Sequence, residues 1–440
     1  MRIGLQTWGS EGDLRPFYAL ANELASRGHE VRLVTTNVEG RDLKAFAAPS
    51  VAVTDVGTSL FYQRQAELQA GAKALMQLRN PLVQFERIVV ETMDPVNEAM
   101  LQAGRELAAW ADFVVVHVVA HAGVTAAQAE RKPFGLLAFA PMFPTRAYPP
   151  MTAPSLGPGN RLLWWLAARA MDRILAGRIN QLRAHVALPP VHRPSTAVTA
   201  QAALVLLAMS PALLPRPADW PGHFHVPGFL ELAGPGQLAS ASASLAKDES
   251  HTSAPPTALP TMLEAFLQAG PPPALFTVGS MANIEPTRAV VLAHAAIAAA
   301  RANGLRCVVQ LPAGAHDAVR SSDVCAFAHA PHAQLFPRCA LLMHHGGAGT
   351  THAAMRAGRP AIHLPHLADQ YYWGKLAAAR GVAAAPLPAS EVTERRLTQR
   401  VASVVNHSAM AERARALAAV VAAEHGPQMA CEAIERTRLA

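Results

Sequence analysis

Cysteine is scarce in this sequence of 440 residues, and no two cysteines have the spacing of a zinc finger or a redox motif. The four cysteines all lie in apolar segments of the C-terminal half: Cys307, Cys325, Cys339 and Cys431. We therefore predict that they are small buried side chains of a protein in a reducing cytoplasm. A disulfide framework and a cysteine-based metal site are both disfavoured.

Long apolar runs and blocks of like charge are also missing. The longest apolar stretches, such as 113–120 and 202–209, are far shorter than a membrane-spanning helix, and the apolar run at the N-terminus is too short for a signal peptide. The net charge of +7 comes mostly from scattered arginines. This pattern favours anionic ligands and disfavours nucleic acid. We expect a cytoplasmic location, with peripheral membrane contact and the oligomeric state left open.

What the sequence does contain is a repeated alternation of apolar strands and amphipathic helices. Strands expected at 2–7 and 30–35 flank a helix pattern over 16–27, which predicts a parallel strand–helix–strand unit. Four more strands are expected in this half, at 51–56, 112–119, 135–139 and 205–209. Residues 234–260, rich in Ala, Ser, Gly, Pro and Thr, indicate a linker or surface loop.

The same alternation restarts after that stretch. Strands are expected at 274–278, 306–310, 325–328, 341–344 and 361–364, and helical sequence fills 394–438. A chain of this length is too long for one ordinary core, so two α/β domains are predicted.

Residues 158–188 combine an apolar stripe with arginines. The stripe falls roughly on one helical face and consists of Leu162, Leu163, Trp165, Leu166, Ala170 and Ile174. It is typical of a helix that packs on its own domain. A membrane-surface helix, or an apolar wall facing an acceptor, is the alternative interpretation.

A glycine-rich turn, His345–Thr350, follows the expected strand at 341–344 and leads into a helix. Glycines let the backbone approach a ligand closely and take positive φ. A helix start offers unpaired N–H groups and the positive end of the dipole, so the turn suits a phosphate. His345 can add a hydrogen bond or a positive charge, and Thr350 a hydroxyl. A purely structural turn is the alternative, because the motif is neither the dinucleotide fingerprint nor a Walker loop.

Asp369 and Gln370 follow the next expected strand, at the edge of the sheet where ligands of α/β proteins bind. A carboxylate beside an amide can bind two neighbouring hydroxyls, such as those of a hexose. A helix cap formed by Asp369 is the alternative.

Together these motifs resemble the donor signature of the UDP-glycosyltransferase superfamily, most closely its sterol, lipid and antibiotic-tailoring branches. The matching positions around the turn are His345–Thr350, Ala354, Gly358, Pro360, Pro365 and Asp369–Gln370. Further matches are Gly9–Asp13, Gly279–Met281 and Ala330–Phe336, the last of which resembles the loop near the nucleotide base. They occur in the expected order, whereas residues 40 to 230 match only in general style.

The resemblance implies an α/β chain with the GT-B fold, in which the parallel sheets of two Rossmann-like domains face each other across a cleft. Its domains would be an acceptor domain at 1–230, a linker or flexible loop at 231–260, a donor domain at 261–415, and a helix within 416–440 that crosses back. It also implies the transfer of a hexose from a UDP- or dTDP-sugar, with UDP-glucose as the first candidate donor. The transfer would invert the anomeric carbon and would need no metal or other cofactor. Composition, not the resemblance, indicates the acceptor: the Trp164–Trp165 helix and the segment Pro141–Pro144 suggest an apolar acceptor wall, which fits a sterol, a lipid or a polyketide-like molecule better than a charged one.

The resemblance also assigns residues to the donor. The diphosphate would be held by His345, Gly347, Ala348, Gly349 and Thr350, and the sugar by Asp369 and Gln370. Further candidate donor contacts are Ser10, Gly279, Ser280, Ala330 and His332.

An acceptor hydroxyl needs a positioned base as it attacks the sugar carbon. Asp13 is the candidate catalytic base, because it lies in the first strand-to-helix turn, within the frame Gly12–Pro16. Many relatives carry a histidine in this frame, and the antibiotic and sterol branches carry an aspartate. An N-cap of the first helix is the alternative for Asp13. His117 and His121, after the central apolar strand, are either supports for the base or structural histidines.

Two other functions remain open at this point. A nucleotide-sugar epimerase can share the GT-B fold, and a non-catalytic nucleotide-sugar-binding protein would share the donor site. The Asp13 turn and the pair Asp369–Gln370 favour transfer. A nicotinamide dehydrogenase is disfavoured because the dinucleotide fingerprint is absent.

Overall fold

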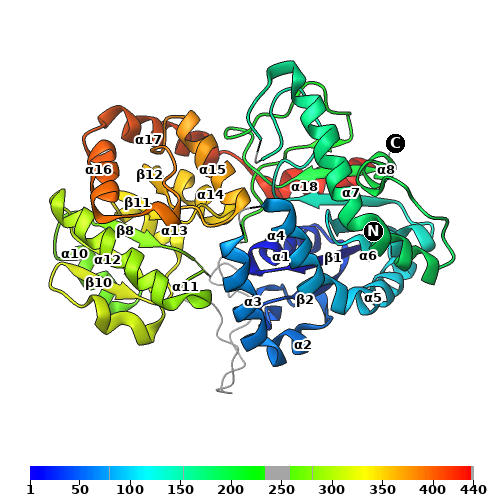
Figure 1. Ribbon diagram of the computed structural model, residues 1–440. Coiled ribbons are helices and arrows are strands. Elements are labelled where there is room, and N and C mark those ends of the chain that lie inside the picture. Colours follow the sequence, from blue (N-terminus) through cyan, green and yellow to red (C-terminus); the bar gives the residue numbers. More distant parts are fainter. Residues whose placement is uncertain (79, 152, 233–257, 280, 438–440) are drawn as a thin grey trace. The chain divides into compact units, whose positions relative to one another are not determined.

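The computed structural model describes residues 1–78, 80–151, 153–232, 258–279 and 281–437 (Figure 1). The chain forms two compact units. The first consists of the described parts of 1–211, 215–254 and 425–440, and the second of the described parts of 212–214 and 255–424. Most of the linker predicted at 231–260 lies outside the described residues.

The first unit is built on a seven-stranded parallel sheet in the order β3-β2-β1-β4-β5-β6-β7. Its strands are β1 (Arg2–Gly9), β2 (Glu30–Asn37), β3 (Val51–Asp55), β4 (Phe113–His117), β5 (Phe134–Ala138), β6 (Leu204–Leu207) and β7 (Phe224–His225). Central strands β4 and β5 are buried along their whole length. Helices therefore cover both faces of the sheet, as parallel sheets require.

The helices of the first unit connect its strands, singly after β1 and β4 and in groups after β3 and β5. They are α1 (Glu11–Ser26), α2 (Thr58–Gln63), α3 (Gln65–Gln77), α4 (Pro81–Ile88), α5 (Asn97–Trp110), α6 (His121–Ala129), α7 (Asn160–His185), α8 (Pro194–Gln201) and, from the far end of the chain, α18 (Gly426–Thr437).

The last helix, α18, belongs to the core of the first unit (Figure 1). Its Cys431 and Ile434 are fully buried in the same cluster as Leu20 and Leu24 of α1. At the rim, Glu435 lies 3.0 Å from the ring of His29. The C-terminal helix thus returns to the first unit, as predicted.

The second unit contains a five-stranded parallel sheet in the order β10-β9-β8-β11-β12. Its strands are β8 (Ala274–Thr277), β9 (Cys307–Gln310), β10 (Val324–Phe327), β11 (Leu341–His344) and β12 (Ala361–His363). Its helices are α10 (Thr261–Gln268), α11 (Met281–Ile284), α12 (Pro286–Ala302), α13 (His332–Leu335), α14 (Ala348–Arg356), α15 (Ala368–Ala379), α16 (Glu394–Val405) and α17 (Ser408–Ala422). The prediction of two parallel α/β halves is confirmed.

Two elements differ from their sequence-based expectation for local reasons. Helix α1 begins at Glu11, five residues before the predicted start, because Ser10 caps it and Asp13 folds back onto Ser10. Pro16 consequently lies inside the helix rather than at its start. No pattern predicts strand β7, because its two residues are too few to produce a periodicity.

Candidate functional site

The glycine-rich turn lies at the carboxyl end of β11, a strand between β8 and β12. Gly346 has φ +90°, a conformation that other residues adopt only with strain. A Cβ atom on Gly346 would lie 3.0 Å from the backbone oxygen of Gln370. Glycine is therefore required here, and the turn packs tightly against the start of α15.

Helix α14 starts immediately after this turn. Its first intrahelical hydrogen bond runs from the amide of Thr351 to the oxygen of Gly347, at 2.9 Å. The N–H groups of Ala348, Gly349 and Thr350 precede that bond and have no carbonyl partner within the helix. Gly349 is exposed and Thr350 is partly exposed. The predicted diphosphate residues thus form one helix N-terminus that suits an anion.

The His345 ring is wedged between two glycines. A Cβ atom on Gly279 would lie 2.6 Å from Cε1 of His345, and one on Gly347 would lie 2.5 Å from Nε2. Burial lowers the pKa of His345 to about 3, and the neighbouring His366, His332 and His363 contribute to this lowering. The ring is therefore neutral near pH 7. Its Nδ1 is buried and has no hydrogen-bond partner among the described residues.

A chain of hydrogen bonds fixes the loop that carries Gly279. The amide of Gly279 donates to Oγ1 of Thr277 at 3.0 Å, and this hydroxyl donates to Oε1 of Gln310 at 2.6 Å. Nε2 of Gln310 donates to the oxygen of Ala328 at 3.0 Å. The ends of β8, β9 and β10 are thereby tied together. Sequence reasoning missed Thr277 and Gln310, although each is a polar residue at the end of an apolar strand.

Two buried histidines at the ends of neighbouring strands pack beside the turn. His344 and His363 are register partners on β11 and β12, and their ring centroids are 4.4 Å apart. Nδ1 of His344 accepts a hydrogen bond from the amide of Gly346 at 3.1 Å. Burial lowers the pKa of His363 to about 4 and the pKa of His344 well below its usual range. The sequence signal for this pair was the polar residue that ends each buried strand.

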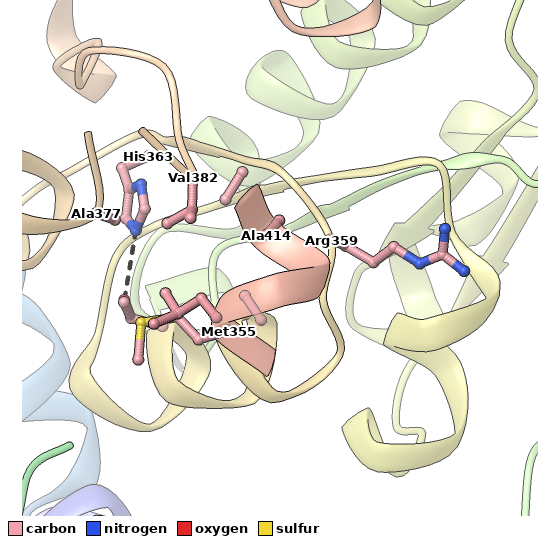
Figure 2. A pocket seen from close by; sticks show the side chains of 10 residues that line it. Met355, Arg359, His363, Ala377, Val382 and Ala414 are labelled. Carbon is pink, nitrogen blue, oxygen red and sulfur yellow. Dashed lines mark hydrogen bonds between the residues drawn. The ribbon is translucent and has the colours of Figure 1, made fainter. Parts of the chain in front are cut away.

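His363 also borders the cavity in Figure 2, most of whose lining residues come from α14, β12, α15 and α17. Its Nε2 lies 3.5 Å from Oγ1 of Thr351, the contact that the dashed line marks. The cavity has a volume of about 10 Å³ and is otherwise lined mainly by apolar side chains such as Met355 and Val382. It has room for about one water molecule and is too small for a sugar nucleotide.

The side chain of Gln370 stabilises a loop of the backbone, in addition to its predicted role as a sugar ligand. Its Oε1 accepts hydrogen bonds from the amides of His366, at 2.7 Å, and Leu367, at 3.2 Å. This closes the loop between β12 and α15 and leaves the Nε2 amide as the donor of the side chain. Asp369 is in the first turn of α15, whose N-cap is Leu367.

The remaining donor candidates of the second unit lie around the same sheet edge. The imidazole of His332 stacks on Phe336, with ring centroids 4.2 Å apart. Ala330 lies in the preceding loop, after β10, and is partly exposed. Ser280, predicted as a further contact, lies outside the described residues.

In the first unit, Asp13 lies in the turn between β1 and α1. Its Oδ2 accepts hydrogen bonds from the amide and the hydroxyl of Ser10, both at 2.9 Å. Gly9, with φ +137°, makes this possible, because a Cβ atom there would lie 2.3 Å from Oδ2 of Asp13. Asp13 is the third residue of α1 and not its N-cap.

The environment of the Asp13 carboxyl acts on its pKa in opposite directions. Burial raises the pKa, and the two hydrogen bonds from Ser10 lower it, with burial the stronger influence. The Asp13 side chain is nevertheless 35% exposed, so solvent reaches part of it. A carboxyl of raised pKa that remains accessible suits proton transfer.

His117, at the end of β4, places Nε2 3.8 Å from Oδ1 of Asp13. Its Nδ1 accepts a hydrogen bond from the amide of Val119 at 3.4 Å, which puts the ring proton on Nε2, facing the carboxylate. Burial among Phe17, Phe139 and other rings lowers its pKa to about 3. His117 is therefore a neutral donor directed at Asp13.

His121 lies further along the chain, in the first turn of α6, and is likewise buried. Its Nδ1 has no hydrogen-bond partner among the described residues, and burial lowers its pKa to about 4. Of the two histidines, the structure brings His117 to Asp13.

Within the described ranges, no three His, Cys, Asp or Glu side chains gather as metal ligands. None of the helices in these ranges is long and apolar enough to cross a membrane.

Comparison with known proteins relates both halves to glycosyl transfer. The family model described as Erythromycin biosynthesis protein CIII-like, C-terminal domain, matches residues 295–436. The O-mycaminosyltylonolide 6-deoxyallosyltransferase of Streptomyces fradiae is 31% identical over 99% of this chain and 97% of that protein. A sterol 3-beta-glucosyltransferase of Arabidopsis thaliana is 28% identical over 90% of this chain and 59% of that protein.

Among solved structures, the glycosyltransferase VinC in complex with dTDP has a TM-score of 0.65 with this chain. The two sequences are 19% identical, and the match covers 100% of both chains. This likeness shows the shared two-domain fold.

Proposed function

Because the chain belongs to the UDP-glycosyltransferase superfamily of GT-B glycosyltransferases, we propose that it transfers a hexose from a nucleoside diphosphate sugar to a hydroxyl of a lipophilic acceptor. The N-terminus of α14, with the neutral His345 beside it, is the observation that carries this proposal. An anion site of this kind meets the main electrostatic need of the reaction, stabilisation of the leaving diphosphate.

In the proposed donor complex, the diphosphate lies against the amides of Ala348, Gly349 and Thr350. His345 donates a hydrogen bond to a phosphate oxygen from whichever ring nitrogen carries its proton. The hexose lies beside α15, where Asp369 accepts hydrogen bonds from its hydroxyls and Nε2 of Gln370 donates one. This division of labour follows from Oε1 of Gln370 already being occupied by backbone amides.

Chemically, the acceptor oxygen attacks the anomeric carbon as the bond from that carbon to the diphosphate oxygen breaks. The electron pair of this bond leaves with the diphosphate, and the hydroxyl proton passes to Asp13. Attack opposite to the leaving group inverts the anomeric centre. The helix dipole and hydrogen bonds stabilise the leaving group, so we propose that no metal ion is needed.

His117 is proposed to assist Asp13 without touching the substrate. Its Nε2–H faces Oδ1, and a shortening of the 3.8 Å separation would give a hydrogen bond to the ionised carboxylate. Such a bond favours the ionised form of Asp13, which is the form that can take the proton from the attacking hydroxyl.

The donor is proposed to be a UDP- or dTDP-hexose, with UDP-glucose and dTDP-glucose as the first pair to compare. The relatives named above act, by their names, on O-mycaminosyltylonolide and on sterols. We infer a hydrophobic acceptor of the sterol, lipid or polyketide kind.

The deciding experiment incubates the protein with UDP- and dTDP-sugars and a panel of lipophilic alcohols, and follows nucleotide release and product mass. We expect a product heavier by one hexose, of inverted anomeric configuration. Nucleotide release without an acceptor product, accompanied by an altered sugar, would favour an epimerase. Donor binding without any turnover would favour a non-catalytic binding protein.

A second measurement tests the diphosphate site directly. His345→Ala should weaken donor binding at least tenfold in calorimetry, because a hydrogen bond to a charged oxygen is lost. His185→Ala, at the exposed end of α7, is the matched control. Equal donor affinity in His345→Ala and the parent would refute the diphosphate assignment.

A further inference from the structure

Helix α7 (Asn160–His185) has one face packed on the first unit and one face in solvent. Trp164 is buried and donates its indole N–H to the oxygen of Tyr148 at 2.9 Å. On the opposite side, Leu162 is 58% exposed, Trp165 48% and Leu166 51%. Three large apolar side chains within five positions of one helix are thus open to solvent.

Arginines flank these apolar side chains. Arg161, Arg169 and Arg173 are exposed, and none of them has a carboxylate partner among the residues that the structure describes. The guanidinium of Arg169 lies 4.7 Å from the centre of the Trp165 ring. The one acidic residue of α7, Asp172, is buried and accepts a hydrogen bond from the amide of Ser195. The exposed face of the helix therefore carries positive charge only.

We propose that this α7 surface, made of Arg161, Leu162, Trp165, Leu166, Arg169 and Arg173, binds the surface of an anionic lipid bilayer. A helix that lies in the bilayer interface inserts Leu and Trp side chains among the acyl chains and keeps its arginines at the headgroups. The amphipathic indole of Trp165 suits the headgroup level. Exposed arginines that have no carboxylate partner among the described residues supply the attraction to anionic lipids.

The charge pattern favours a lipid surface over a second copy of the chain. A symmetric interface brings the same surface of two molecules together. The exposed face of α7 would then oppose the arginines of its copy without a carboxylate to pair with them, and like charges facing each other disfavour association. Anionic headgroups offer the missing negative charge.

This inference stands apart from the catalytic proposal, since binding to lipid requires neither donor nor base. Where both hold, the enzyme would meet lipophilic acceptors at the membrane in which they concentrate. Failure of one leaves the other measurable, because transfer to a soluble acceptor can be followed without vesicles.

The first test sediments the full-length protein with vesicles of phosphatidylcholine alone, and with vesicles that contain phosphatidylglycerol. We expect binding to the anionic vesicles and its loss in high salt. Arg169→Glu/Arg173→Glu should reduce the bound fraction by about tenfold or more. The matched control is Arg395→Glu/Arg415→Glu, which makes the same charge change at exposed positions of α16 and α17 and should bind like the parent.

The second test uses tryptophan fluorescence and does not depend on the charge variants. All six tryptophans lie within the described ranges, and Trp165 alone among them is exposed. Anionic vesicles should therefore shift the emission to the blue in the parent and not in Trp165→Phe. The proposal is overturned if anionic vesicles do not bind, if both charge variants lose binding equally, or if the blue shift persists in Trp165→Phe. A dimer that Arg169→Glu/Arg173→Glu dissociates would instead identify a second copy as the occupant.

Discussion

At the scale of single residues, Asp13 and His117 form a pair in which the carboxylate is partly exposed and the imidazole is buried. Ser10 holds one oxygen of Asp13, and His117 faces the other. The exposed member can meet a substrate hydroxyl, whereas the imidazole, at 5% exposure, is shielded from solvent. This difference in exposure is why we assign the proton transfer to Asp13 and a positioning role to His117.

We expect Asp13→Asn to lower kcat by about 10²- to 10⁴-fold, because a general base is lost while the shape of the side chain is kept. Donor affinity, measured by calorimetry, should stay near that of the parent, since the α14 site is intact. Glu11→Gln, two residues earlier in α1, is the matched control and should retain turnover. Unchanged kcat in Asp13→Asn would eliminate the proposed base.

The role of His117 is visible in the pH profile. Loss of its hydrogen bond should disfavour ionised Asp13, so in His117→Leu the acid limb of kcat/KM should move to higher pH. His117→Gln, which keeps an N–H donor, should move the limb back toward the parent position. A purely structural role would lower activity in both variants without a shift of the limb.

At the scale of elements, the proposed donor site depends on how tightly the turn between β11 and α14 is packed. The amide of Gly346 is held by His344, and its Cα faces the backbone of Gln370. The turn, the β12–α15 loop and the Gly279 loop therefore form one connected support. Displacing any of them should move the amides that are proposed to hold the diphosphate.

Gly346→Ala should weaken donor binding at least tenfold, because the added Cβ meets backbone at 3.0 Å and φ +90° strains any residue with a side chain. Gly177→Ala is the matched control. Gly177 lies within α7, where no atom would meet the added Cβ within 4 Å, so this change should be neutral or stabilising. Titration of both variants with UDP and dTDP measures the difference. Equal affinities would show that the turn does not hold the donor.

At the scale of the whole molecule, both units contain histidines that are buried in the neutral form. Burial lowers the pKa to about 3 for His117 and His345, and to about 4 for His121, His352, His363 and His366. In the unfolded chain these residues have their ordinary pKa near 6.5. The unfolded state therefore binds more protons than the folded state between about pH 6.5 and pH 4.

The contribution of these neutral histidines to the free energy of unfolding should consequently be fully present above about pH 6.5. It should decrease as the pH falls toward 4. We expect the Tm from calorimetry to be nearly constant from pH 8 to pH 7 and to drop steeply below pH 6. His352→Gln, which removes one buried imidazole, should flatten this slope, whereas His185→Gln, at an exposed position, should not. A Tm that does not change down to pH 4.5 would contradict this account.

The amino-acid order was sufficient to predict two parallel α/β halves, a glycine-rich turn before a helix, and Asp13 in the first strand-to-helix turn. These features are local: apolar runs predict strands, and glycines before a helix predict an exposed helix N-terminus. The return of the C-terminal helix was implied only by the resemblance, because it depends on contacts between residues about 400 positions apart, such as Arg27 and Glu435.

The side chains that support these sites could be identified only from the folded chain. Folding brings His117 to Asp13 across adjacent strands, and it occupies Oε1 of Gln370 with backbone amides. It also makes His345 neutral, where the sequence had allowed a charge. Hydrogen-bond partners and burial set these properties, and both arise from strands that are neighbours in space but distant in the chain. The sequence therefore predicts where the proposed site residues lie, and packing sets the protonation state and the hydrogen-bond partners of each of them.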